Sequence, residues 1–320
     1  MSPFKTSKVP VLVQYVLLAV AWGASFLFIK IGLEGLSPGQ VVLGRLVAGA
    51  ATLAVLCLVT RRTLPSAPVV WAHLTVVAVL LCVAPFLLFA WAEQHISSGL
   101  ASIYNATTPL MTMVVALALL PQERLSRGRL LGLALGFVGV IVLVAPWNGL
   151  GQAGTFGQGA CLAATACYGL AFTYLRRYVT PRGLPALSVA TVQVGIGATI
   201  MLVLAPLLAA QPARVNLRVV LAVLALGAIG TGLAYVWNTN VVAAWGATNA
   251  STVTYLTPVV GVVLGVIVLN EQLSWVEPLG ALLVILGIAV TQNRLRILRD
   301  RRAGRAKRHS HGQTVDDYSI

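Results

Sequence analysis

Long apolar runs alternate with short polar turns along most of the chain. A window of about 19 residues finds runs long enough to cross a hydrocarbon core of ~30 Å as helices. Their approximate spans are 10–30, 39–60, 69–92, 97–120, 128–146, 155–176, 185–209, 217–242, 247–269 and 275–293. The runs are continuous rather than alternating, which favours helices over barrel strands in lipid. The pattern predicts an all-α integral membrane protein with ten transmembrane helices.

The second half of the chain repeats the pattern of the first. Around the fourth and ninth predicted helices the paired positions are Thr108 with Thr257, Pro109 with Pro258, Glu123 with Glu271, Gly132 with Gly280 and Gly139 with Gly287. Further upstream the pairs are Trp22 with Tyr168, Phe26 with Phe172, Lys30 with Arg176, Arg45 with Gln193, Phe86 with Tyr235 and Phe89 with Asn238. The repeat predicts two five-helix units, at 1–149 and 150–293, followed by a tail at 294–320. Because the first run belongs to this repeat, it is not expected to be a cleaved signal peptide.

Five is an odd number, so the second unit must enter the membrane from the opposite side. The expected arrangement is an inverted-topology pair related by a pseudo-two-fold axis in the membrane plane. The basic residues agree, because 18 of them fall on one side of the predicted membrane, whereas Lys30, Arg214 and Arg218 fall on the other. By the positive-inside rule both termini are predicted to be cytoplasmic, in a multi-pass plasma-membrane protein.

Composition narrows the class further. The chain is 58% hydrophobic and only 9% charged, which excludes an ordinary water-soluble domain. The net charge of +14 is explained by topology, so no nucleic-acid partner is predicted. The cysteines lie in apolar runs without ligand spacing, and neither a metal nor another cofactor is expected.

The tail is basic from Arg294 to Arg308 and polar beyond it. We expect it to be disordered. It could contact anionic lipid headgroups, or it could simply anchor the topology at the end of the last helix. The sequence does not indicate an oligomeric state.

These residues together resemble the drug/metabolite transporter superfamily and, within it, the ten-helix EamA-type branch. The resemblance covers roughly residues 10–293 and is carried by the run from Trp22 to Phe26 with Lys30, by Arg45, and by the Thr-Pro openings with their downstream glutamates. It implies transport of amino acids, other metabolites or drugs. Relatives that carry cationic drugs have a glutamate in their first helix, whereas this sequence has no acid between Val9 and Lys30.

Candidate substrate-binding residues lie at helix irregularities, on aromatic faces and at polar positions inside apolar helices. Pro109 and Pro258 remove amide donors, which frees backbone groups beside Asn105, Thr108, Thr254 and Tyr255, although packed kinks are the simpler alternative. The complete predicted set is Trp22, Ser25, Phe26, Arg45, Phe86, Phe89, Asn105, Thr108, Tyr168, Phe172, Tyr235, Asn238, Thr254 and Tyr255.

Two features of this set suggest specificity. Phe86 and Phe89 of the first half correspond to Tyr235 and Asn238 of the second, so a cavity between them would have one apolar and one polar wall. Arg45 lies about 10 Å into its helix. It must pair, reach water or hold a substrate carboxylate.

The leading hypothesis is a secondary transporter that exports small metabolites, such as amino acids or related amphipathic compounds, by alternating access. Multidrug efflux and lipid flipping are alternatives within transport. A receptor or a purely structural role is an alternative outside transport. An intramembrane enzyme is disfavoured, because no nucleophile–base pair or metal-ligand set faces a common point in the apolar helices.

No carboxylate lies in the middle of a predicted span. Glu93, near the outer end of the third run, comes closest, and we expect water and headgroups to keep it ionised. The charge pattern therefore predicts facilitated diffusion or exchange rather than coupling through a central carboxylate.

Overall fold

The computed structural model describes residues 9–120, 126–148 and 153–292. Predictions that concern Glu123, the segment 121–125 and the tail at 294–320 lie outside the described residues. The α-helices are α1 Val11–Gly32, α2 Pro38–Val59, α3 Pro68–Ala78, α4 Ala84–Ala92, α5 Ser98–Asn105, α6 Thr108–Leu119, α7 Arg127–Val144, α8 Ala153–Tyr174, α9 Ala186–Leu208, α10 Leu217–Gly227, α11 Ala234–Trp245, α12 Ala247–Ala250, α13 Val253–Leu269 and α14 Val276–Thr291. Within the described residues the protein is all-helical, without strands.

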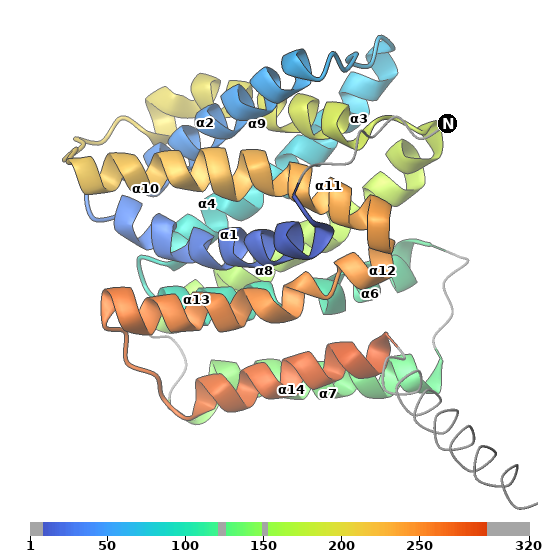
Figure 1. Cartoon of the computed structure of the whole chain (residues 1–320). Helices are drawn as coiled ribbons and strands as arrows, with labels where there is room; N and C mark the ends of the chain where they lie inside the picture. Colours follow the sequence, from blue (N-terminus) through green and yellow to red (C-terminus); the bar gives the residue numbers. More distant parts are fainter. Residues whose placement is uncertain (1–8, 121–125, 149–152, 293–320) are drawn as a thin grey trace, which may run out of the picture.

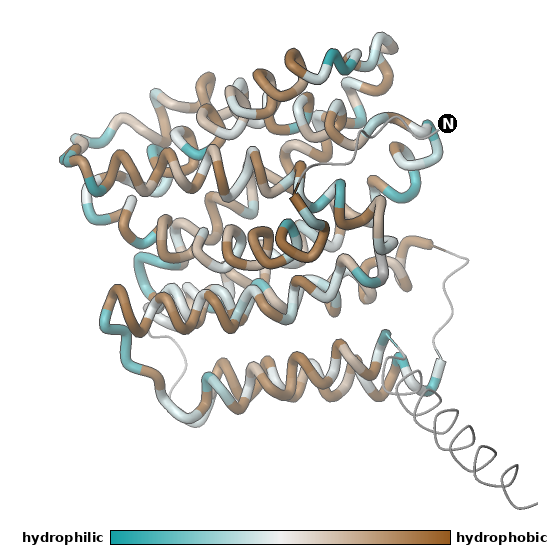
Figure 2. The backbone as a smooth tube through the Cα atoms, in the orientation of Figure 1, coloured by the Kyte–Doolittle hydropathy of each residue, from teal (hydrophilic) through white to brown (hydrophobic). Residues whose placement is uncertain are grey.

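The helices pack side by side in one bundle (Figure 1). Helix α1 runs through its middle and contacts α13 on one side and α10 and α11 on the other. Helices α7 and α14 form a close pair at the lower edge of the view. Hydrophobic residues fill the helices, and hydrophilic residues gather in the loops at their ends (Figure 2). Large apolar side chains such as Leu58, Leu207 and Ile267 also face outward, as lipid contact requires.

Within the described residues, seven helical stretches are long and apolar enough to cross a membrane. They are Val11–Gly32, Pro38–Val59, Pro68–Ala92, Ser98–Leu119, Arg127–Val144, Ala186–Leu208 and Leu217–Trp245. The ninth and tenth predicted spans correspond to the shorter apolar helices α13 and α14. The sixth corresponds to α8, which has 22 residues. Length and composition therefore identify a multi-pass membrane protein.

The third and eighth predicted helices are interrupted where the sequence pattern indicated none. Each contains a π-helical segment, at Val79–Val83 and at Ala228–Leu233, which separate α3 from α4 and α10 from α11. Such a segment inserts an extra residue into the helical turn and re-aims the side chains that follow. The two segments occupy corresponding positions in the sequence repeat.

The helix breaks that the sequence predicted at Pro109 and Pro258 lie before these prolines. The break between α5 and α6 falls at Ala106 and Thr107, and Pro109 lies in the first turn of α6, where its missing amide costs no hydrogen bond. Pro258 lies inside α13, after the break that separates α12 from α13. The helix ends, more than the prolines, free the backbone groups.

Glycines let helices approach closely within the fold. A Cβ atom on Gly287 of α14 would lie 2.5 Å from the backbone nitrogen of Gly136 and 2.7 Å from the carbonyl oxygen of Gly132, both in α7. A Cβ atom on Gly261 of α13 would lie 2.5 Å from the Ser102 side chain in α5. The close approach at these points requires glycine.

Polar contacts join the two halves at one end of the bundle. Glu271, which follows α13, accepts hydrogen bonds from the backbone amides of Ser98 (2.7 Å) and Gly99 (3.0 Å) and from the Ser98 hydroxyl (3.0 Å) at the start of α5. These amides would otherwise be unsatisfied at a helix N-terminus. The glutamate of the second repeat therefore links α13 to the first half of the chain.

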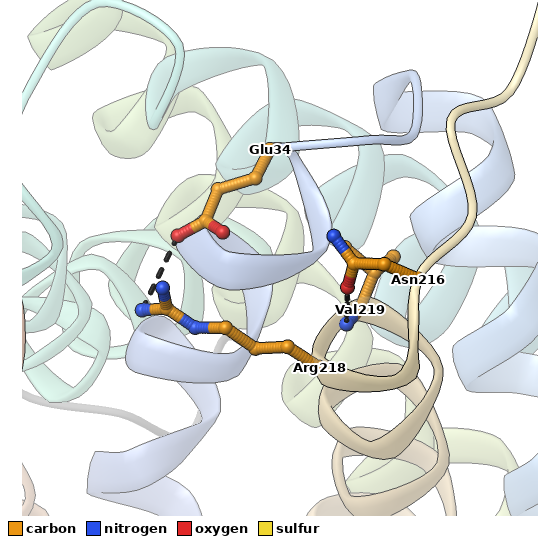
Figure 3. Close-up of polar contacts among 4 residues, drawn as sticks. All are labelled: Glu34, Asn216, Arg218 and Val219. Atoms are coloured by element: carbon orange, nitrogen blue, oxygen red, sulfur yellow. Dashed lines mark hydrogen bonds and ion pairs between the residues drawn. The ribbon is translucent and has the colours of Figure 1, made fainter.

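A second contact between the halves is exposed (Figure 3). Arg218 at the start of α10 forms an ion pair of 3.4 Å with Glu34 beyond α1. The Asn216 side chain accepts a hydrogen bond of 2.9 Å from the Val219 amide and caps α10. The ion pair is solvent-exposed and contributes about 0–1 kcal/mol, whereas an asparagine cap contributes about 0.5–2 kcal/mol. The start of α10 is thus fixed more by its cap than by its ion pair.

Candidate functional site

A cavity lies in the middle of the bundle, between the two halves of the chain. The space in it that the centres of water molecules can occupy is about 190 Å³. Its lining residues are Trp22, Ser25, Phe26, Ile29, Arg45, Leu81, Phe86, Phe89, Asn105, Thr108, Tyr168, Phe172, Gly230, Thr231, Tyr235, Asn238, Thr254 and Thr257. Both π-helical segments contribute to this lining, through Leu81 and through Gly230 and Thr231.

One wall of the cavity is aromatic. The rings of Phe26 and Phe89 meet edge to face at 5.5 Å between centroids, and Phe89 stacks on Tyr168 at 6.2 Å. These contacts hold the rings in fixed orientations. The wall offers a rigid apolar surface on which the body of an organic solute can pack.

Arg45 of α2 lies on another wall and is 9% exposed. Its Nε donates a hydrogen bond of 3.0 Å to the Thr231 hydroxyl, and its guanidinium carbon lies 3.5 Å from the centroid of the Phe86 ring. A cation over an aromatic face is attracted by the quadrupole of the ring. Thr231 and Phe86 therefore position a positive charge at the cavity.

Most hydroxyl groups at the cavity are already satisfied by their own helices. Ser25 donates to the carbonyl of Ala21, Thr254 to that of Ser251 and Thr257 to that of Val253. The side-chain amides of Asn105 and Asn238, in contrast, have no hydrogen-bond partner among the described residues. These two amides are the neutral polar groups with the most capacity to bind a solute.

The structure brings nearly all of the sequence-predicted residues together. Trp22, Ser25, Phe26, Arg45, Phe86, Phe89, Asn105, Thr108, Tyr168, Phe172, Tyr235, Asn238 and Thr254 line the cavity, and their role in substrate binding stays a prediction. Tyr255 does not line it. Its hydroxyl donates a hydrogen bond of 2.8 Å to Gln292 after α14, because the residue after Thr254 points about 100° away from it around α13.

Sequence reasoning missed several lining residues, of which Thr231 is the most informative. The repeat pairs Phe86 with Tyr235, and the same register pairs Cys82 with Thr231, four residues earlier in each helix. This pairing would have placed Thr231 one turn from Tyr235, on the same face. Among the described residues no cluster of three or more metal-ligating side chains occurs.

The environment of Glu93 corrects the sequence prediction. Glu93 follows α4 and is 0% exposed, and neither carboxylate oxygen has a hydrogen-bond partner in the described part of the chain. The Lys30 ammonium donates to the backbone carbonyls of Glu93 and Ile96 instead. Burial raises the pKa of the Glu93 carboxyl well above its usual value, and the nearby Lys30 opposes this rise. The carboxyl group is thus shielded from water, in contrast to the sequence-based expectation of a hydrated interfacial charge.

Replacing Glu93 by glutamine should change transport by less than about tenfold, or ~1.4 kcal/mol in the barrier, because glutamine mimics the protonated carboxyl. It should also alter the dependence of stability on pH. A carboxyl whose pKa is raised on folding stabilises the protein below its unfolded pKa of about 4.3, and this contribution is lost as pH rises towards the folded pKa. Melting temperatures between pH 5 and 9 should therefore fall for the wild type relative to Glu93→Gln as pH increases. Parallel curves would contradict the assigned burial.

A helical membrane bundle with a cavity lined by both halves of the chain has the architecture of a membrane transporter. The sequence model of the EamA-like transporter family matches the chain twice, over residues 10–145 and 155–292. The chain belongs to the EamA-like transporter family and is a multi-pass membrane transporter.

Individual relatives agree with this membership. The chain is 24% identical over 290 residues to an uncharacterized transporter, YdfC, of Bacillus subtilis, covering 88% of this chain and 91% of the relative. It is 26% identical to an uncharacterized inner membrane transporter, YedA, of Escherichia coli, covering 85% and 87%. It is 27% identical to a "probable amino-acid metabolite efflux pump" of Salmonella typhimurium, covering 89% and 96%.

A solved crystal structure shares the fold. It superposes with a TM-score of 0.62 at 21% sequence identity, covering 90% of this chain and 98% of that one. At this identity the likeness concerns the arrangement of the helices alone.

Proposed function

We propose that this transporter is a secondary exporter of small amphipathic metabolites, such as amino acids or related compounds, and that it works by alternating access. The central cavity carries the proposal, since side chains from both halves line it and since it combines an aromatic wall with polar groups. The efflux role named for the Salmonella relative supports the direction and the class of solute.

The proposed mechanism rests on ten membrane helices in two inverted five-helix units, 1–149 and 150–293. Two matches to one family model support a duplicated unit, and the corresponding π-helical segments support a shared local geometry. Seven long apolar helices in the described part of the chain, together with α8, α13 and α14, would account for the ten proposed crossings. Rocking one unit against the other would expose the cavity to each side of the membrane in turn.

The proposed orientation predicts a clear labelling result. A cysteine replacing Arg127, at the start of α7, should react with an impermeant maleimide in inverted vesicles and not in intact cells, because the loops near 61–68, 121–128 and 177–184 carry the cytoplasmic positive charge. A cysteine replacing Arg218 should give the reverse pattern and serves as the control. Labelling of the Arg127 position from outside intact cells would show that the orientation is inverted.

Multidrug efflux is the main alternative, and catalysis is not proposed. The cavity of the described structure is lined by no acidic residue, whereas a carrier of cationic drugs would gain from a carboxylate. Expression should therefore change the level of a metabolite without raising resistance to lipophilic cations.

An untargeted comparison of intracellular and extracellular metabolites tests the function. Cells that express the wild type should lose a solute from the cytoplasm and accumulate it outside, relative to cells without the gene. The cavity variant Asn105→Ala, expressed at the same level, should behave like the absence of the gene. No difference in any metabolite between the wild type and either control would contradict the proposal.

A further inference from the structure

The described residues that line the central cavity carry one fixed positive charge and no fixed negative charge. Among its lining side chains only the guanidinium of Arg45 is ionised at neutral pH, because the other polar groups are hydroxyls, phenols and amides. Within the described part of the chain Arg45 forms no ion pair with a carboxylate. An unpaired charge in an apolar membrane interior is costly, so the protein groups alone do not neutralise the charge at this site.

The geometry leaves the binding edge of this guanidinium open. Its face lies against Phe86, and its Nε is used by Thr231. Its two terminal amino groups have no hydrogen-bond partner among the described residues. A guanidinium binds carboxylate in a fork geometry, with two parallel N–H donors, and this pairing is stronger than neutral hydrogen bonds.

We infer that the solute carried by this site is an organic monoanion, a carboxylate with an apolar or aromatic body, and not a zwitterionic amino acid. The inference rests on the proposed transport function and keeps its class of small amphipathic metabolites. It replaces amino acids, the example given there, by related acids that carry the negative charge alone. A monoanion would neutralise Arg45. A zwitterion would bring an ammonium group that needs an anion of its own, and the lining of the cavity supplies none.

The other residues that line the cavity indicate the chemistry of the part of the solute that does not contact Arg45. Phe26 and Phe89 form the fixed aromatic surface that would pack against its apolar body. Asn105 and Asn238 would bind a hydroxyl or carbonyl group, because their amides are not used within the described protein. The solute is thus expected to be an acid whose charge and apolar body lie at different ends.

Four compounds that share a phenyl ring and differ in charge provide the test. They are 3-phenylpropionate (anion), phenylalanine (zwitterion), 3-phenylpropylamine (cation) and 3-phenylpropionamide (neutral). The affinity of the purified full-length protein for each compound is measured at pH 7 by titration calorimetry. We expect 3-phenylpropionate to bind at least about tenfold more tightly than the other three, as one charge-assisted bidentate pair would provide.

Variants of one position connect the preference to Arg45. Arg45→Gln installs the residue that occupies the corresponding position of the second half, Gln193. This variant should bind 3-phenylpropionate about tenfold or more weakly than the wild type and should bind 3-phenylpropionamide equally well. Arg45→Lys should retain part of the preference for the anion. Arg218→Gln removes an exposed arginine outside the cavity and should leave the affinities for 3-phenylpropionate and 3-phenylpropionamide unchanged. If Arg45→Gln does not fold, the comparison of the four ligands on the wild type still decides the matter.

The outcomes separate this inference from the proposed function. Binding of phenylalanine as tight as that of 3-phenylpropionate, or no binding of 3-phenylpropionate at millimolar concentration, would overturn the inference. If the anion binds selectively but liposomes containing the protein move none of the four compounds and no metabolite, the anion site is correct and the transport proposal is wrong. If liposomes move a metabolite equally well with wild type and a folded Arg45→Gln variant, transport is correct and the anion site is wrong.

Discussion

Replacing Gly287 by valine should strongly destabilise the folded protein and lower its melting temperature. Any Cβ atom at this position would lie 2.5 Å from the Gly136 nitrogen and 2.7 Å from the Gly132 carbonyl oxygen, and these are backbone atoms that cannot rotate away. Helices α7 and α14 would have to separate along their contact. Overpacking typically costs about 1–3 kcal/mol, and the larger figure applies where backbone must move. That is a large part of a total stability of about 5–15 kcal/mol.

Gly195→Val is the matched control. A Cβ atom on Gly195 in α9 would meet nothing within 4 Å, so the same substitution in another membrane helix should be tolerated. Gel filtration of the solubilised protein and its melting temperature give the comparison. Equal yields and melting temperatures for the two variants would contradict the close α7–α14 contact.

Asn238→Ala should reduce transport by more than about tenfold and leave the melting temperature nearly unchanged. The Asn238 amide lines the cavity and has no partner among the described residues, so alanine removes a group that only the solute uses. Loss of hydrogen bonds from a buried polar group of the solute costs about 1–3 kcal/mol. The measurement is the initial rate of solute movement in proteoliposomes, with the amount of inserted protein determined in parallel.

Asn240→Ala is the control on the same helix, two residues further along. Its amide donates a hydrogen bond of 2.8 Å to Gln14 of α1 and does not line the cavity. This variant should lower stability more than transport. The opposite ranking of the two variants would mean that Asn238 has a structural role.

The repeat made most of the cavity predictable from sequence. Pairs such as Phe86 with Tyr235 and Phe89 with Asn238 occupy corresponding helix faces, and residues on the inner faces of two related units converge at their interface. Arg45 stood out for a different reason, since a charge inside an apolar helix needs a specific environment. Neither argument required knowledge of the packing.

Other features depend on packing that a helical pattern does not contain. The apolar pattern does not reveal the π-helical segments at Val79–Val83 and Ala228–Leu233, which bring Leu81 and Gly230 into the lining of the cavity. Glu93 lies one residue beyond a span, where interfacial water is the normal expectation, yet neighbouring elements bury it completely. Its burial follows from those neighbours rather than from its position in the sequence.

Access to the cavity from both sides of the membrane tests the central claim most directly. A single cysteine replaces Thr254, which lines the cavity and whose hydroxyl is bonded to the Ser251 carbonyl, in a protein whose four native cysteines are changed to alanine and whose transport is retained before and after this last change. Its reaction with an impermeant maleimide is then measured in right-side-out and inverted vesicles. Alternating access through this cavity predicts labelling from both faces, slowed in each case by transported solute. Labelling from one face alone, with or without solute, would contradict the proposal that solute passes through this cavity.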